Sequence, residues 1–205
     1  MNQVARTCIV WTFLTISFPG SASERPKGPP VTVNVYNDAQ VPAQLLTQAM
    51  QEATRIFRKI GIDTVWMECQ SPKADAERAS GCHPPSGPTV LALRIVPWSS
   101  KLGQAVFGTA FLSPEGEGTY CDVFYDSVEK LHQDWHVSLP RILGHTMAHE
   151  VGHLLLGTNA HSQMGIMRPK WLRQELRRVE MGALLFTPDQ GRSIQTKLLP
   201  VTAQN

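Results

Sequence analysis

Two histidines and a glutamate stand close together in the stretch HEVGH, residues 149–153. If this stretch is helical, the four-residue spacing places the imidazoles of His149 and His153 on one face, one turn apart. Two imidazoles so placed can bind one zinc ion, and the carboxylate of Glu150 beside them is a candidate general base. The spacing therefore predicts the centre of a metal site on a helix.

A catalytic zinc site usually has three protein ligands and one open position, so a further ligand must come from elsewhere in the chain. His161 is one candidate, because Gly157 can end the helix in a left-handed conformation and let the chain turn back to the metal. Glu175 is the alternative, as a glutamate on a later helix in the manner of the gluzincin-type zinc peptidases. We expect His161, since Gly157 has no role in that alternative.

Gly165-Ile166-Met167 follows His161 and is a candidate tight turn with Met167 beneath the site. The combination resembles the metzincin metalloproteases, whose signature is HExxHxxGxxH followed by a methionine-bearing turn. Here the motif is lengthened to HExxHxxxGxxxH. The resemblance implies zinc as the cofactor, hydrolysis of peptide bonds, and Met167 in the floor of the site. Glu150 would then take the proton of the zinc-bound water.

Hydrophobic periodicity predicts the elements that must position these residues. We expect strands at residues 31–36, 62–68, 89–96, 103–112 and 119–125, and helices at 42–60, 139–156, 169–179 and 187–198. The helix over 139–156 carries the metal motif. Beyond it, Arg168 and Trp171 are candidates for a specificity pocket; alternatively, Arg168 is a solvated surface residue and Trp171 a half-buried packing residue.

This order of elements is also similar to that of metzincin catalytic domains. It implies an α+β, zincin-like fold: a twisted mixed sheet of about five strands packed on two long helices, then an irregular C-terminal subdomain ending in a helix. Residues 108–114 and 186–195 further resemble the matrixin branch, the first as its edge strand and the second as its closing helix. The resemblance predicts that Gly108, Thr109, Ala110 and Phe111 bind the substrate backbone, as an exposed sheet edge can.

The N-terminus has the pattern of a secretory signal peptide: a basic Arg6, an apolar run over residues 8–18, and small residues at 20–23. The apolar run is much shorter than the ~20 residues that span a membrane. We expect a signal peptide over residues 1–23, cleaved near Ala22 or Ser23, and one catalytic domain over 24–205. The protein would be secreted, either outside the cell or into a periplasm, without a stable membrane anchor.

Three cysteines remain after such processing. In an oxidising compartment Cys69 and Cys82 can form a disulfide that closes the loop between them, worth roughly 3 kcal/mol in the chain-entropy model. Cys121 would then be unpaired, as a buried thiol in a strand or, alternatively, in a metal or redox role.

The charge is nearly balanced, with 19 Lys and Arg against 17 Asp and Glu and a net charge of +2. No basic cluster interleaved with aromatic residues is present, so nucleic acid is not an expected partner. We expect a monomer that acts on a protein or peptide substrate. The sequence contains no dense Asp/Asn loop of the kind that binds calcium. A secreted protein that keeps this fold and its zinc but cleaves nothing is the remaining alternative.

Overall fold

The computed structural model describes residues 28–69, 82, 84–98 and 106–199. Within them, five strands form one sheet in the order β2-β1-β3-β5-β4. Three of the four neighbouring pairs are parallel, and β4 runs antiparallel to β5 at one edge. The strands are β1 (Val31–Asn37), β2 (Thr64–Cys69), β3 (Val90–Val96), β4 (Gly108–Phe111) and β5 (Tyr120–Phe124).

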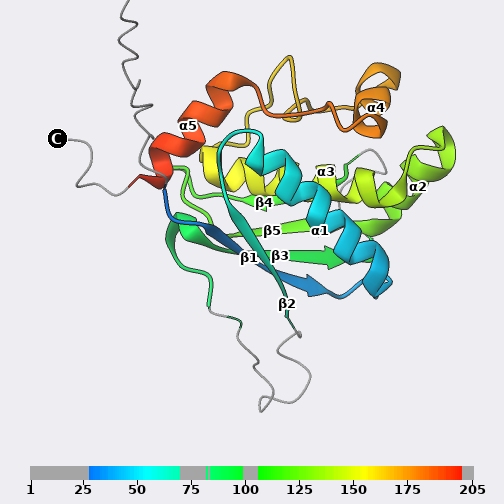
Figure 1. Ribbon diagram of the computed structural model, residues 1–205. Coiled ribbons are helices and arrows are strands. Elements are labelled where there is room, and N and C mark those ends of the chain that lie inside the picture. The colour runs from blue at the N-terminus through cyan, green and yellow to red at the C-terminus, as the bar shows by residue number, and fades with distance from the viewer. Residues whose placement is uncertain (1–27, 70–81, 83, 99–105, 200–205) are drawn as a thin grey trace, which may run out of the picture.

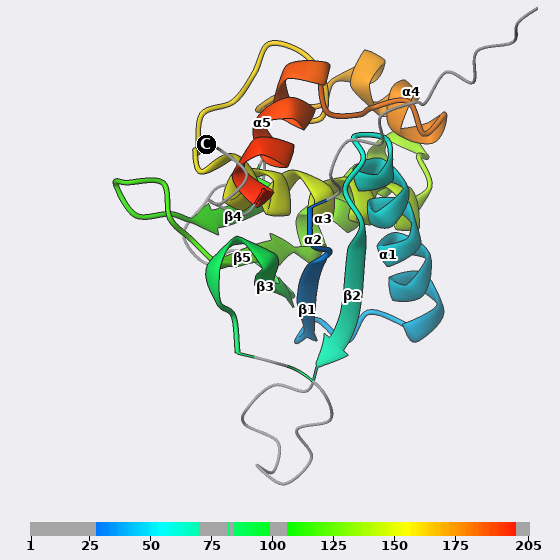
Figure 2. The same cartoon turned by 60° about the vertical axis from the view of Figure 1, so that its left-hand side comes forward.

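The helices lie on one face of this sheet (Figure 1). They are α1 (Ala43–Arg58), α2 (Tyr125–Trp135), α3 (Leu139–Leu156), α4 (Arg173–Glu180) and α5 (Pro188–Leu198), with a short 3-10 helix η1 (Gly87–Thr89) before β3. Helices α1 and α3 pack side by side over the sheet, and α4 and α5 lie beyond α3 (Figure 2). The helix that carries the metal motif is thus enclosed between the sheet and the C-terminal segment.

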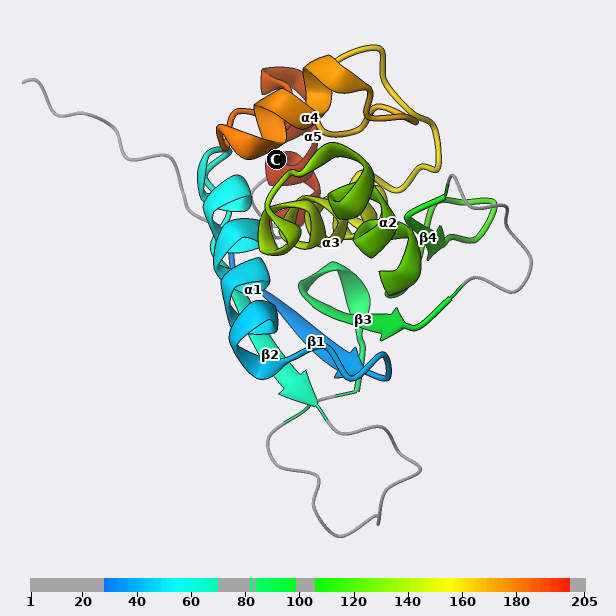
Figure 3. The ribbon, with the colours of Figure 1, turned by 90° about the vertical axis from the view of Figure 1, so that its right-hand side faces the viewer.

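This enclosure explains the composition of α3. Fourteen of its 18 residues are buried, because a helix covered on several sides must be apolar nearly all round. Gly144 allows α1 to approach closely, since a Cβ at this position would lie 2.5 Å from the carbonyl oxygen of Ala49. Figure 3 shows α1 and α3 together above the strands. The core between these layers positions the metal motif at the edge of the sheet next to β4.

The predicted order of elements is confirmed, with three corrections. The strand expected at 103–112 is β4, only Gly108–Phe111, although residues 103–105 lie outside the described part of the chain. The helix expected from 169 begins only at Arg173, because the Glu175 carboxylate accepts the backbone N–H of Leu172 and caps the helix there. Helix α2 was not predicted at all.

The cysteines behave as expected. Cys69 and Cys82 form a disulfide with a Cα–Cα distance of 6.1 Å, and Cys121 is a buried free thiol on β5. The predicted signal peptide over residues 1–23 lies outside the described residues. Among the residues that are described, no helix is long and apolar enough to cross a membrane.

Candidate metal centre

Helix α3 carries the first three residues of the centre and ends where the motif requires. His149, Glu150 and His153 lie in its last two turns, and all three side chains are buried. Gly157 follows as the C-cap with φ +71°, and its N–H bonds the carbonyl oxygen of His153. A left-handed residue at this position reverses the chain. The loop beyond it then returns His161 to the helix.

The three histidines converge on one point. Their ligand atoms all lie within 4.8 Å of one another, and the Nε2 atoms of His149 and His153 are 3.0 Å apart. A tetrahedral zinc ion with Zn–N distances of ~2.0–2.1 Å separates its ligands by about 3.4 Å. The spacing and the all-nitrogen donor set therefore fit zinc, and the longer segments on each side of Gly157 still deliver His161 to the site.

Backbone carbonyls orient two of the rings. His149 Nδ1 lies 2.8 Å from the carbonyl oxygen of Ile166, and His153 Nδ1 lies 2.8 Å from that of Thr158. A carbonyl oxygen can only accept a hydrogen bond, so each Nδ1 carries the hydrogen and donates it, and each Nε2 keeps its lone pair. The tautomer that a metal needs is thus set by the fold.

Burial also keeps these rings neutral. It lowers the pKa of His149 to about 3, with the neighbouring His153 adding to the effect. The pKa of His153 is lowered as well, chiefly by burial, and that of His161 is lowered by partial desolvation although its side chain is exposed. Desolvation disfavours the charged imidazolium, so the donor set remains available for a cation at neutral pH.

Glu150 lies against the edge strand. A Cβ at Gly108 would be 2.6 Å from both Cγ and Cδ of Glu150, so only glycine lets β4 pass this close. Burial raises the pKa of Glu150 to about 8, because a carboxylate without solvent is disfavoured. The protonated form of this buried carboxyl group is therefore favoured at neutral pH.

Met167 lies directly beneath the helix. Its side chain is buried, and its sulfur would be 2.9 Å from a Cβ at Gly152, between the two helical ligands. Gly165 gives the turn its left-handed residue at φ +74°, and the backbone N–H of Ser162 bonds the Met167 carbonyl oxygen at 2.8 Å. The methionine thus packs against the turn of α3 that carries His149 and His153.

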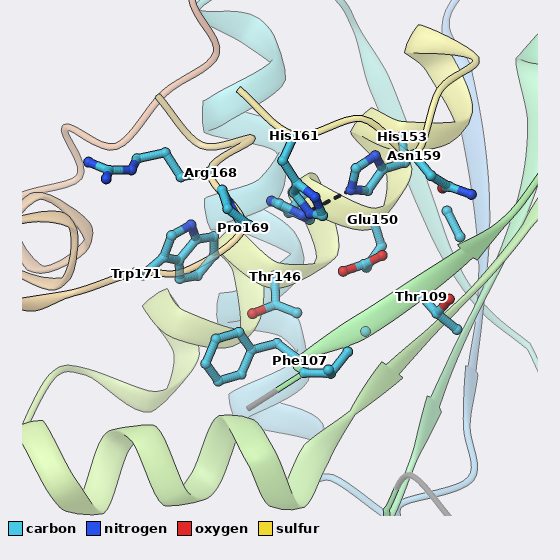
Figure 4. Close-up of a pocket in the computed structure, with 14 residues that line it drawn as sticks. Phe107, Thr109, Thr146, Glu150, His153, Asn159, His161, Arg168, Pro169 and Trp171 are labelled. Carbon is cyan, nitrogen blue, oxygen red and sulfur yellow. Dashed lines mark hydrogen bonds between the residues drawn. The ribbon is translucent and has the colours of Figure 1, made fainter. Parts of the chain in front are cut away.

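A cavity of about 360 Å³ opens at the centre. The predicted strand residues Gly108, Thr109 and Ala110 line it, whereas Phe111 does not and instead packs on Tyr120. Arg168 and Trp171 line it too. Sequence reasoning missed the other lining residues (Figure 4), which are Val106, Phe107, Thr146, Asn159 and Pro169. Thr146 had a signal, because it lies one turn before Glu150 on the same helix face.

Glu175, the alternative third ligand, is engaged elsewhere. One carboxylate oxygen accepts from Arg168 Nη1 at 2.6 Å and the other from the backbone N–H of Leu172 at 3.1 Å. It is not part of the histidine cluster found among the described residues. His145, one turn before His149, also lies apart: its Nδ1 bonds the Arg141 carbonyl oxygen and its ring packs edge-on against Trp171.

Solved structures with a similar fold are found at low sequence identity. A zinc-dependent peptidase from Methanocorpusculum labreanum has a TM-score of 0.53 and 14% identity, over 79% of this chain and 99% of that one. Metalloproteinase-II from Bacteroides fragilis has a TM-score of 0.53 and 11% identity, over 85% and 54%. Archaemetzincin from Methanopyrus kandleri has a TM-score of 0.49 and 15% identity, over 84% and 98%. No family model and no curated protein matches the sequence.

The chain has the fold of zinc-dependent peptidases. This confirms the predicted fold class, with its five-stranded mixed sheet and its C-terminal segment ending in a helix. The three-histidine site is present on that fold. At these identities the likeness concerns the fold, and what the site does must be argued from its residues.

Proposed function

We propose that the protein is a secreted zinc-dependent endopeptidase of the metzincin type, with His149, His153 and His161 as ligands. The observation that carries the proposal is the convergence of three neutral imidazoles at one end of a cavity that also contains a buried glutamate. Zinc held by such ligands supplies a Lewis acid and lowers the pKa of bound water toward ~7.

Glu150 is the proposed general base. Its carboxylate lines the same cavity as the three ligands and accepts the proton of the attacking water. Beside a bound cation the charged carboxylate would be favoured before attack, and once the proton is taken up burial favours the protonated carboxyl, which would donate that proton to the leaving amine. Met167 packs beneath the ligands and fixes the floor, which limits how far they can move.

Strand β4 is the proposed substrate-binding edge, as in the matrixin branch. It pairs with β5 on one side only, and it ends the sheet. An extended peptide can add to such an edge through main-chain hydrogen bonds, which fix the backbone and leave selectivity to the pocket. The occupant would lie above Glu150, since Gly108 contacts that side chain. Phe111 would contribute its backbone, because its side chain packs on Tyr120.

The experiment that tests this function compares wild type with Glu150→Ala. The mature chain is loaded with zinc and given unfolded protein and a peptide library, with and without a chelator. We expect wild type to cleave internal peptide bonds and to stop when zinc is removed. Glu150→Ala should bind zinc and fold, yet cleave nothing.

The same experiment separates the alternatives. Equal activity in wild type and Glu150→Ala would refute the role of the base. Zinc binding without any cleavage by wild type would favour the non-catalytic binding protein. Release of only terminal residues would exclude an endopeptidase while leaving the metal chemistry intact. Detection of the processed protein outside the producing cell, beginning near residue 24, tests secretion.

A further inference from the structure

Thr146 occupies the helix face that carries the metal chemistry. It lies three residues before His149 and four before Glu150, so its side chain shares their face of α3. It lines the cavity at the centre, yet the residue is only 1% exposed. Figure 4 shows its side chain among the residues that line this cavity, together with Glu150, Phe107 and Trp171. It therefore belongs to the deep wall of the cavity rather than to its rim.

The hydroxyl of Thr146 has no hydrogen-bond partner among the residues that the structure describes. A threonine inside a helix often bonds the carbonyl oxygen one turn back, but here the hydroxyl forms no such bond. The hydroxyl is also buried, so it does not face bulk solvent. A buried polar group in this state gains from any partner that can enter.

Two aromatic side chains line the same cavity as Thr146. Phe107 and Trp171 are stacked, with ring centroids 6.0 Å apart and planes inclined by 21°, and both line the cavity. The indole N–H of Trp171 donates a hydrogen bond to the Ile166 carbonyl oxygen at 3.2 Å. The cavity therefore offers apolar aromatic surface from this stacked pair and one hydroxyl without a partner among the described residues. Flat rings pack well against such surfaces.

We propose that Thr146 determines specificity, by selecting a substrate side chain that has a flat ring with a polar tip, as tyrosine has. The ring packs against Phe107 and Trp171, and the phenolic hydroxyl pairs with Thr146 Oγ1. Phenylalanine fits the same walls but leaves Thr146 without a partner. This inference rests on the proposed peptidase function and names a substrate preference within it.

The expected effect is a preference for tyrosine over phenylalanine of about 3- to 10-fold in kcat/KM, the worth of one neutral hydrogen bond. The test uses peptide pairs that differ only by tyrosine or phenylalanine, scanned over the positions on each side of the cleaved bond. Wild type is compared with Thr146→Val, which keeps the shape and removes the hydroxyl, and with Thr146→Ser, which keeps the hydroxyl.

We expect the preference at one position in wild type and in Thr146→Ser, and its loss in Thr146→Val. An unchanged ratio in Thr146→Val, or no tyrosine preference at any position, overturns the inference. Zinc content and thermal unfolding check each variant, and Thr146→Ala replaces the valine variant if that one does not fold.

A second measurement separates this inference from the proposed function. The same peptide pairs are titrated into zinc-loaded Glu150→Gln, with and without Thr146→Val, and the binding ratio is read by calorimetry. Cleavage without tyrosine preference refutes only the role of Thr146. Absence of cleavage by wild type refutes the peptidase, while the binding ratio still decides whether Thr146 selects the phenol.

Discussion

Gly108 touches the proposed base, so its replacement by alanine tests how Glu150 is placed. A Cβ at residue 108 would lie 2.6 Å from Cγ and Cδ of Glu150 and 2.6 Å from the carbonyl oxygen of Asp122. Carbon atoms in contact normally lie about 3.5–4.0 Å apart, so the strand and the carboxylate must separate by roughly 1 Å in Gly108→Ala.

Two effects of different size follow from this separation. Overpacking of this kind lowers the free energy of unfolding by about 1–3 kcal/mol. A displacement of about 1 Å at a catalytic group can lower a rate about 100-fold. We therefore expect Gly108→Ala to fold and bind zinc, to unfold at a somewhat lower temperature, and to hydrolyse peptides with kcat reduced about 100-fold.

The control variant is Gly118→Ala. Its Cβ would contact the carbonyl oxygen of Phe111, so it strains the same β4–β5 hairpin without reaching Glu150. It should lose stability and keep kcat, and any displacement of the substrate-binding backbone at Phe111 should appear in KM instead. The assay measures steady-state kcat, zinc content and thermal unfolding for both variants. Wild-type kcat in zinc-loaded Gly108→Ala, or an equal loss in Gly118→Ala, would refute the claim that β4 positions the base.

Three further outcomes test the site and its support. His161→Ala should lose zinc while Glu175→Ala keeps it, measured as metal per chain; zinc retained by His161→Ala would contradict the ligand assignment. Burial lowers the pKa of His145 from 6.5 to about 4. As the pH falls, His145 is therefore protonated in the unfolded chain before it is protonated in the folded one. The free energy of unfolding is fully present above pH 6.5 and should fall by up to roughly 3 kcal/mol toward pH 4. Urea unfolding of His145→Gln should lack that part of the pH dependence, and an identical curve would argue against it. Reduction of the Cys69–Cys82 disulfide should lower the unfolding free energy by roughly 3 kcal/mol, with no effect of reductant on Cys82→Ser.

The sequence predicts α3 and its ligands because local rules govern both. The bounds 139–156 agree with the structure, since Gly157 stops the helix by its left-handed conformation and the i, i+4 spacing sets the ligand face. The disulfide partners were predictable for a similar reason, because only a short loop separates them. In each case the decisive information lies within a few residues of the feature.

Helix α2 escaped prediction because its sequence signals are weak. It has only three buried residues, Ser127, Val128 and Leu131, and no side chain caps its N-terminus at Phe124. Its C-cap is His136 in a left-handed conformation, where a glycine would have marked the end. The helix is stabilised by packing against α3, and a tertiary contact of this kind cannot be inferred from the local sequence.

The late start of α4 has a similar origin. The segment looks helical from Pro169, yet the Trp171 ring is buried and its N–H bonds the carbonyl oxygen of Ile166. Glu175 then caps the helix at Leu172. Residues that helical propensity alone would have placed in α4 therefore line the cavity instead. Thr146 and Phe107, which are far apart in sequence, line it as well.

One backbone atom joins the metal ligands to this wall. The Ile166 carbonyl oxygen accepts from His149 Nδ1 at 2.8 Å and from Trp171 Nε1 at 3.2 Å. It is held in turn by the bond from the Ile166 N–H to the Leu185 carbonyl oxygen at 2.9 Å and by the left-handed turn at Gly165. A shift of this turn must therefore move a ligand ring and the indole together. Because such partners set ligand orientation, the orientation of the His149 ring and that of the Trp171 indole are coupled through the Ile166 carbonyl oxygen.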